Sequence, residues 1–125
     1  MPFQVQVNHP DRMVVGVASG QVTVADLNHF VDELGRAQAY RYRKLVDLIG
    51  GTWALSDEEV DAFCERVRNT PPDRRSGPIA LVTTEAGEPF ARMFTELTGG
   101  KRPVKIFSSI HAARTWLRQN SLAEL

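Results

Sequence analysis

The sequence has little cysteine and no excess of charge of either sign. Its single cysteine, Cys64, excludes an intrachain disulfide and a cysteine-rich zinc site. Fifteen Lys and Arg residues balance fifteen Asp and Glu residues, so the formal net charge is zero. Proteins that bind the nucleic-acid backbone through general charge carry a basic excess, and we therefore expect no nucleic-acid partner.

Long apolar runs are also missing. No segment reaches the roughly 18 apolar residues that cross a bilayer, and the first twelve residues lack the apolar stretch of a secretory signal. We therefore expect a cytoplasmic protein without a membrane span. The three histidines (His9, His29 and His111) do not have the spacing of metal ligands. We expect neither a metal nor a cofactor.

What the chain does have is enough apolar sequence for one core. With 125 residues, 42% of them hydrophobic, it fits a single domain. We place that domain at residues 1–120 and treat 121–125 as a C-terminal tail. The longest polar connector, residues 71–78, is a loop and is too short to divide the chain.

The hydrophobic pattern predicts five strands. Residues 3–7 alternate between apolar and polar side chains, and a short turn separates them from a second strand at 13–18, which predicts an antiparallel hairpin. Three further apolar runs, at 45–49, 78–83 and 104–107, are typical of strands buried in a parallel sheet. The first of these three is expected to end at Gly50-Gly51.

Helical periodicity appears between these strands. We expect helices over residues 24–39, after Ser56, around residues 90–97 and after Ser108 or Ser109. The first two begin with the spacing of a capping box, Thr23 with Asp26 and Ser56 with Glu59. Their expected stops include Pro71-Pro72 for the second helix and Gly99-Gly100 for the third.

The resulting order is β-β-α-β-α-β-α-β-α. It predicts a single-domain α/β fold with a mostly parallel five-stranded sheet, an antiparallel edge strand and helices packed on the sheet. An uncovered edge strand offers unpaired backbone groups, so a homodimer formed at that edge is one expectation.

The candidate site lies where the parallel strands end. Ligands of open α/β sheets bind beyond the carboxyl ends of the strands, and hydroxyl groups and free amides there suit an anion or a polar head group. The same hydroxyl groups also serve as ordinary helix N-caps. The ligand- or partner-binding residues expected at this rim are Gly50, Thr52, Trp53, Ser56, Thr83, Thr84 and Ser108.

Several single residues need an interpretation of their own. Trp53 either folds back on the core or forms the wall of a pocket or partner surface. Asp47 stands in an apolar strand, where we expect it to accept loop amide hydrogens. Cys64 falls on the apolar stripe of its helix and is expected to be a buried, inert thiol. The basic cluster Arg41, Arg43 and Lys44 is expected to be solvated surface.

Three segments together carry a family resemblance. Gly20, Thr23 and Asp26 at the first helix, Leu45–Leu48 in a strand and Val104–Leu117 at the end resemble the SpoIIAA-like proteins of the STAS superfamily (sulfate-transporter and anti-sigma-factor-antagonist). The likeness runs from about residue 5 to 119, and the fold is shared with lipid-transfer domains of the CRAL–TRIO type. It implies a small cytosolic bacterial domain with a regulatory or ligand-binding role.

The resemblance also implies a phosphorylated serine nine residues beyond a strand aspartate. Counted from Asp47, that serine is Ser56, but Leu55 stands before it where the family has Asp. A phosphate there would gain about 0.3–1 kcal/mol from the helix dipole. It would be opposed by the acids at 57–59 at up to about 1 kcal/mol each. We therefore favour Ser56 as a structural cap.

Our preferred interpretation is a non-enzymatic STAS-like module. It would recognise a small, partly apolar ligand, such as a lipid, or a regulatory protein partner at the rim. The alternative is a phosphorylation-regulated partner switch that uses Ser56. A third hypothesis is a hydrolase that uses His111 with a rim hydroxyl group.

Overall fold

The computed structural model describes residues 3–70, 76–98 and 102–122. The expected helix stops at Pro71-Pro72 and Gly99-Gly100, and the last three tail residues, lie outside these ranges. Along the chain the elements are β1 (Phe3–Asn8), β2 (Met13–Val22), α1 (Val24–Arg36), β3 (Arg43–Trp53), α2 (Asp57–Arg68), β4 (Ile79–Val82), the 3-10 turn η1 (Glu85–Gly87), α3 (Glu88–Thr98), β5 (Val104–Phe107) and α4 (Ile110–Leu122). Helix α4 thus runs two residues into the expected tail.

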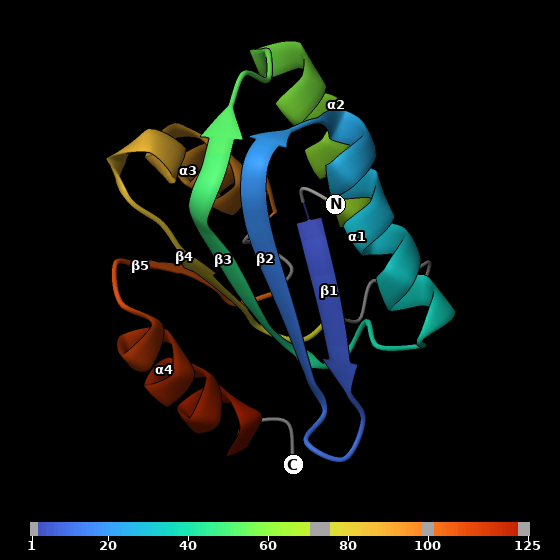
Figure 1. Cartoon of the computed structure of the whole chain (residues 1–125). Helices are drawn as coiled ribbons and strands as arrows, with labels where there is room; N and C mark the ends of the chain where they lie inside the picture. The colour runs from blue at the N-terminus through green and yellow to red at the C-terminus, as the bar shows by residue number, and fades with distance from the viewer. Residues whose placement is uncertain (1–2, 71–75, 99–101, 123–125) are drawn as a thin grey trace.

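The five strands form one sheet in the order β1-β2-β3-β4-β5. Strand β1 is antiparallel to β2, and the other three pairs are parallel. This confirms the predicted α/β fold, with its antiparallel edge strand. Helices α1, α2 and α3 cover one face of the sheet and α4 lies on the other, beside β4 and β5 (Figure 1).

The core has two layers because successive strand residues point to opposite faces. Val46 and Leu48 of β3 belong to the larger cluster, together with the inner faces of α1, α2 and α3. Leu45 faces the other way and packs with Ala113 and Leu117 of α4. All four residues of β4 are buried, as predicted for a strand covered on both faces.

Both predicted capping boxes are confirmed. The Thr23 hydroxyl group accepts from the Asp26 amide at the start of α1, and the Ser56 hydroxyl group accepts from the Glu59 amide at the start of α2. In the described part of the chain, no helix combines the length and apolarity that crossing a bilayer requires.

Helix α1 ends three residues earlier than expected. Its end is closed by Gln38, which adopts φ 54°. The Gln38 amide donates to the Gly35 carbonyl, and the Ala39 amide donates to the Leu34 carbonyl at 2.9 Å. This is a Schellman motif, which usually has glycine at the left-handed position. Because glutamine stands there instead, the sequence carries no stop signal.

Strand β3 is longer than expected, and the prediction that it ends at Gly50-Gly51 is wrong. Both glycines lie inside the strand and pair with β2. A β-bulge precedes them, where Leu48 and Ile49 together stand opposite Ala18. A Cβ on Gly50 would lie 2.9 Å from the Ala18 carbonyl oxygen. The glycine therefore permits a close backbone approach and does not form a turn.

A substitution at Gly16 would test the packing of β2 against the rings of Phe3 and Phe30. A Cβ at this position would lie 2.7 Å from ring atoms of both Phe3 and Phe30. We expect Gly16→Ala to lower the free energy of unfolding by about 1–3 kcal/mol, because both rings would have to shift. Ser19→Ala, at an exposed position of the same strand, should change it by less than about 0.5 kcal/mol. Equal effects in urea denaturation would contradict this packing.

The ionisation and the reactivity of the Cys64 thiol would test whether the inner face of α2 is buried. Its side chain is fully buried, and burial raises the pKa of the thiol from 9.0 to about 11. The unfolded chain therefore ionises first, so stability should fall as the pH rises from about 9 towards 11. We also expect a thiol reagent at pH 8 to label the native protein only as fast as it unfolds. Rapid native labelling that disappears in Cys64→Ala would contradict the assignment.

Candidate functional site

The carboxyl ends of the strands form a stepped edge. One row of paired residues crosses β2, β3, β4 and β5 where the last two strands end, and it consists of Val17, Asp47, Val82 and Phe107. Strand β3 continues with β2 as its only paired neighbour to Trp53, six residues past Asp47. The expected rim residues therefore lie at two levels.

The lower level contains Thr83, Thr84 and Ser108. Thr83 is buried, donates its hydroxyl hydrogen to the Thr84 carbonyl at 2.9 Å and bonds through its amide to the Phe107 carbonyl. Thr84 and Ser108 are exposed. The hydroxyl group of Ser109 accepts from the Ala112 amide at 3.3 Å. Ser109 is thus the residue that caps α4.

The upper level contains Trp53, which packs back onto the core. Its ring stacks on Phe90 with centroids 4.7 Å apart. Its buried Nε1 has no hydrogen-bond partner among the described residues. A Cβ on Gly87 would lie 3.1 Å from this nitrogen and 2.4 Å from the Thr83 hydroxyl oxygen. Turn η1 therefore brings Trp53 and Thr83 together although they lie at different levels.

The remaining expected residues lie along the extension of β3 and just beyond it. Gly50 and Thr52 are exposed. Ser56 is also exposed, and its hydroxyl oxygen is already used by the Glu59 amide at 3.1 Å, while Glu59 accepts from the Ser56 amide at 2.9 Å. The structure thus supports the capping role of Ser56.

Asp47 stabilises the bulge. Its carboxylate accepts from the Ile49 amide at 3.0 Å, two residues along the same strand. The expectation that Asp47 satisfies backbone amides holds. However, the amide it accepts from lies within β3 and not in a loop.

The hydrolase hypothesis receives no support from the geometry. The His111 ring is exposed, and within residues 102–122 no hydrogen bond joins it to Ser108 or Ser109. The described residues also contain no group of three His, Cys, Asp or Glu side chains placed to hold a metal ion.

Exposed apolar side chains occur near the level where β4 and β5 end, which the sequence did not reveal. The exposed large hydrophobic residues of the described chain are Val17, Ile49 and Ile110, with exposed fractions of 38%, 43% and 40%. Val17 belongs to the row defined above, Ile49 lies two residues past Asp47, and Ile110 lies three residues past Phe107. All three therefore lie near the level of this row, spread across the sheet from β2 to the start of α4.

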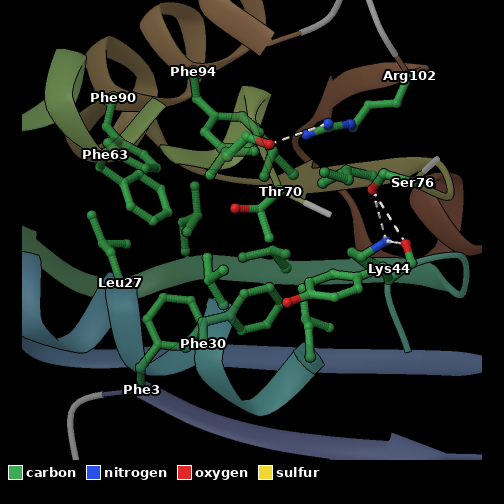
Figure 2. A pocket seen from close by; sticks show the side chains of 18 residues that line it. Phe3, Leu27, Phe30, Lys44, Phe63, Thr70, Ser76, Phe90, Phe94 and Arg102 are labelled. Carbon is green, nitrogen blue, oxygen red and sulfur yellow. Dashed lines mark hydrogen bonds between the residues drawn. The ribbon is translucent and has the colours of Figure 1, made fainter. Parts of the chain in front are cut away.

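A second feature that the sequence did not reveal is an apolar cavity of about 60 Å³ between the sheet and helices α1, α2 and α3 (Figure 2). Lys44 lines it and is only 1% exposed, so the expectation that this lysine is solvated surface is wrong. Its ammonium group donates to the Tyr40 and Tyr42 carbonyls at 2.6 and 2.9 Å. These carbonyls replace the lost water, which explains how a lysine is accommodated there.

Arg102 also lines this cavity, with an exposed fraction of 4%. Its guanidinium group donates to the Val67 carbonyl at 3.3 Å, and its buried Nε finds no partner in the described part of the structure. Burial lowers the pKa of the guanidinium group from its ordinary value.

Comparison with known proteins bears on the fold. No protein-family model matches the chain, and no curated protein matches it. A structure of an uncharacterized protein from the DUF3478 family with a SpoIIAA-like fold, from Shewanella loihica PV-4, is 19% identical with a TM-score of 0.63, covering 92% of this chain and 91% of that chain. An anti-sigma factor antagonist from Mycobacterium paratuberculosis is 18% identical with a TM-score of 0.52, covering 93% and 94%. The chain therefore has a SpoIIAA-like fold, which confirms the fold that the sequence resemblance implied.

The capping role of Ser56 can be measured. Ser56→Ala removes the acceptor for the Glu59 amide and should lower the free energy of unfolding by about 1 kcal/mol. Ser56→Asp should retain most of the stability, because aspartate is an equally good N-cap. Equal losses in both variants, measured by denaturant unfolding, would show that capping is not what Ser56 contributes.

Proposed function

We propose that this chain is a non-enzymatic regulatory module that binds a protein partner through the carboxyl-end rim of its sheet. The observation that carries the proposal is the position of the exposed apolar side chains. Val17, Ile49 and Ile110 all lie around the level where β4 and β5 end. Apolar side chains that gather on an exposed surface and are surrounded by polar groups are typical of protein interaction sites.

The polar surroundings are supplied by residues that the sequence already indicated. Gly50, Thr52, Thr84 and Ser108 are exposed at or beyond the same level. Hydroxyl groups and backbone amides form the hydrogen bonds of a typical interface rim, while apolar side chains form its centre. In this proposal these four residues surround the apolar centre of the contact.

The packing of Trp53 and Thr83 favours a protein partner over a small ligand at this edge. Trp53 stacks on Phe90, and Thr83 is buried beside Gly87. Trp53 and Thr83, which were expected to line a rim pocket, therefore pack against neighbouring residues of the chain.

The similarity to the anti-sigma factor antagonist supports the same class of function. By its description, that protein acts on an anti-sigma factor, which is itself a protein. We extend this property to the present chain as part of the proposal. The partner we expect is an anti-sigma factor of the corresponding kind.

The phosphorylation-regulated switch at Ser56 is the alternative form of this function. Ser56 is exposed at the start of α2, at the position implied by counting from Asp47. The three acids that follow it oppose an added phosphate. Binding measured with Ser56→Ala and Ser56→Asp decides the matter, because equal affinities would exclude the switch.

A homodimer through the β1 edge stays a prediction. Strand β1 pairs only with β2, so its outer backbone groups are unpaired within the sheet. Sedimentation velocity on the full chain would measure its association state.

Substitution at the apolar centre tests the partner surface. We expect an anti-sigma factor encoded in the source genome to bind the chain in calorimetry, and Ile49→Asp and Val17→Asp each to weaken binding at least tenfold. The reason is that a buried unpaired carboxylate is costly at an interface. Gln119→Asp, exposed near the other end of α4, is the matched control and should bind as the original chain does. Failure of every such factor to bind, or binding insensitive to both substitutions, would contradict the proposal.

A further inference from the structure

Among the described residues, the buried guanidinium group of Arg102 has no anionic partner. Arginine carries five N–H donors and stays charged at all ordinary pH values. The described structure gives Arg102 one carbonyl acceptor at 3.3 Å, and its Nε has none. Among residues 3–70, 76–98 and 102–122, no carboxylate forms an ion pair with it. A buried charge without a partner is strongly destabilising, which indicates that something else pairs with this group.

The cavity beside Arg102 has a polar end and an apolar end. Lys44, Ile79 and Val104 form a row at the amino ends of β3, β4 and β5. Ser76 and Arg102 stand just before β4 and β5, so both lie at this end, where Ser76 accepts from Lys44 at 3.3 Å. Figure 2 shows Arg102, Ser76 and Lys44 together, and Arg102 reaching towards Phe94.

The other end of the cavity is lined by aromatic rings. Figure 2 shows Phe63 and Phe90 on the side away from Lys44, with Leu27 and Phe3 below them. The sheet and the helices both contribute to the lining, since Val46 and Leu48 belong to β3 and Phe90 belongs to α3. Of the cavity wall that the structure describes, the residues with polar side-chain groups are those at the amino end together with Tyr40 and Thr70.

We propose that this cavity binds a small amphipathic monoanion, namely a carboxylate with an apolar chain. The carboxylate pairs with Arg102, whose planar group matches two carboxylate oxygens, and the apolar chain lies among the phenylalanine rings. The cavity of about 60 Å³ suits a short chain, since one water needs only about 10–15 Å³ of the same kind of space. This site lies at the amino ends of the strands and is separate from the proposed partner surface.

A purely structural role for Arg102 leads to different results. Val67 lies in the last turn of α2, so Arg102 could serve only to satisfy the carboxyl end of that helix. In that case, replacing it with a neutral side chain of similar length would destabilise the protein. If Arg102 instead is an uncompensated charge awaiting an anion, the same replacement should leave the ligand-free protein at least as stable.

The experiment compares octanoate with octan-1-ol, which has the same apolar chain and no charge. Calorimetry and thermal unfolding at pH 7 would be measured on the full chain and on Arg102→Met and Arg102→Lys. Arg68→Met is the matched control, because Arg68 also donates to a helix carbonyl, that of Leu97, and does not line the cavity. Hexanoate and decanoate would report the chain length that the cavity accepts.

We expect the original chain and Arg68→Met to bind octanoate at least tenfold more tightly than octan-1-ol. Arg102→Met should lose this preference while its ligand-free unfolding midpoint stays equal or rises, and Arg102→Lys should keep part of the preference. Absence of octanoate binding, or the same preference in Arg102→Met, would overturn the proposal. A fall in the ligand-free midpoint of Arg102→Met without loss of the preference would assign Arg102 to helix capping alone.

Discussion

The rest of the structure depends on one constraint: β3 pairs with β2 over a longer stretch than it pairs with β4. Strand β4 accompanies β3 only from Lys44 to Asp47, whereas β2 accompanies it to Trp53. The Asp47 carboxylate stabilises a bulge at Leu48–Ile49. Among the described residues, β4 and β5 end just before this bulge and β1 pairs no further than Ala18, so only β2 and β3 continue together. Turn η1 then packs against the extension of β3 in place of a longer β4.

This arrangement gives the sheet two ends of different character. At the carboxyl ends, Val17 stands in the last row that spans all five strands and Ile49 stands in the bulge beyond it, and both side chains are exposed. At the amino ends, the first residues of β3 carry Lys44 inward, beneath α1 and α2. One end thus presents apolar groups to the outside, and the other buries positive charge in the interior. The two proposed binding events, of a protein partner and of a small anion, are thus assigned to opposite ends of the sheet.

Much of the fold could be predicted from the sequence, because hydrophobic period and capping chemistry act locally. The order of elements, β5 and both capping boxes follow from such local signals. The end of α1 could not be predicted from local signals, because Gln38 adopts a left-handed conformation that usually requires glycine. The length of β3 could not be predicted either, because Gly50 allows a close approach of the Ala18 backbone and does not form a turn. The positions of Thr84 and Ser108 just past β4 and β5 follow from the strand order alone. By contrast, the burial of Lys44 and Arg102 depends on tertiary contacts with segments distant in sequence.

The register of β3 is the claim on which both sites depend, and nuclear Overhauser contacts between backbone protons measure it directly. The account predicts contacts that place Asp47 between Val17 and Val82, and further contacts that place Gly50 opposite Ser19. A spectrum in which Gly50 and Gly51 show turn contacts and none to β2 would contradict it. The stepped rim and the amino-end cavity would then both lose their structural basis.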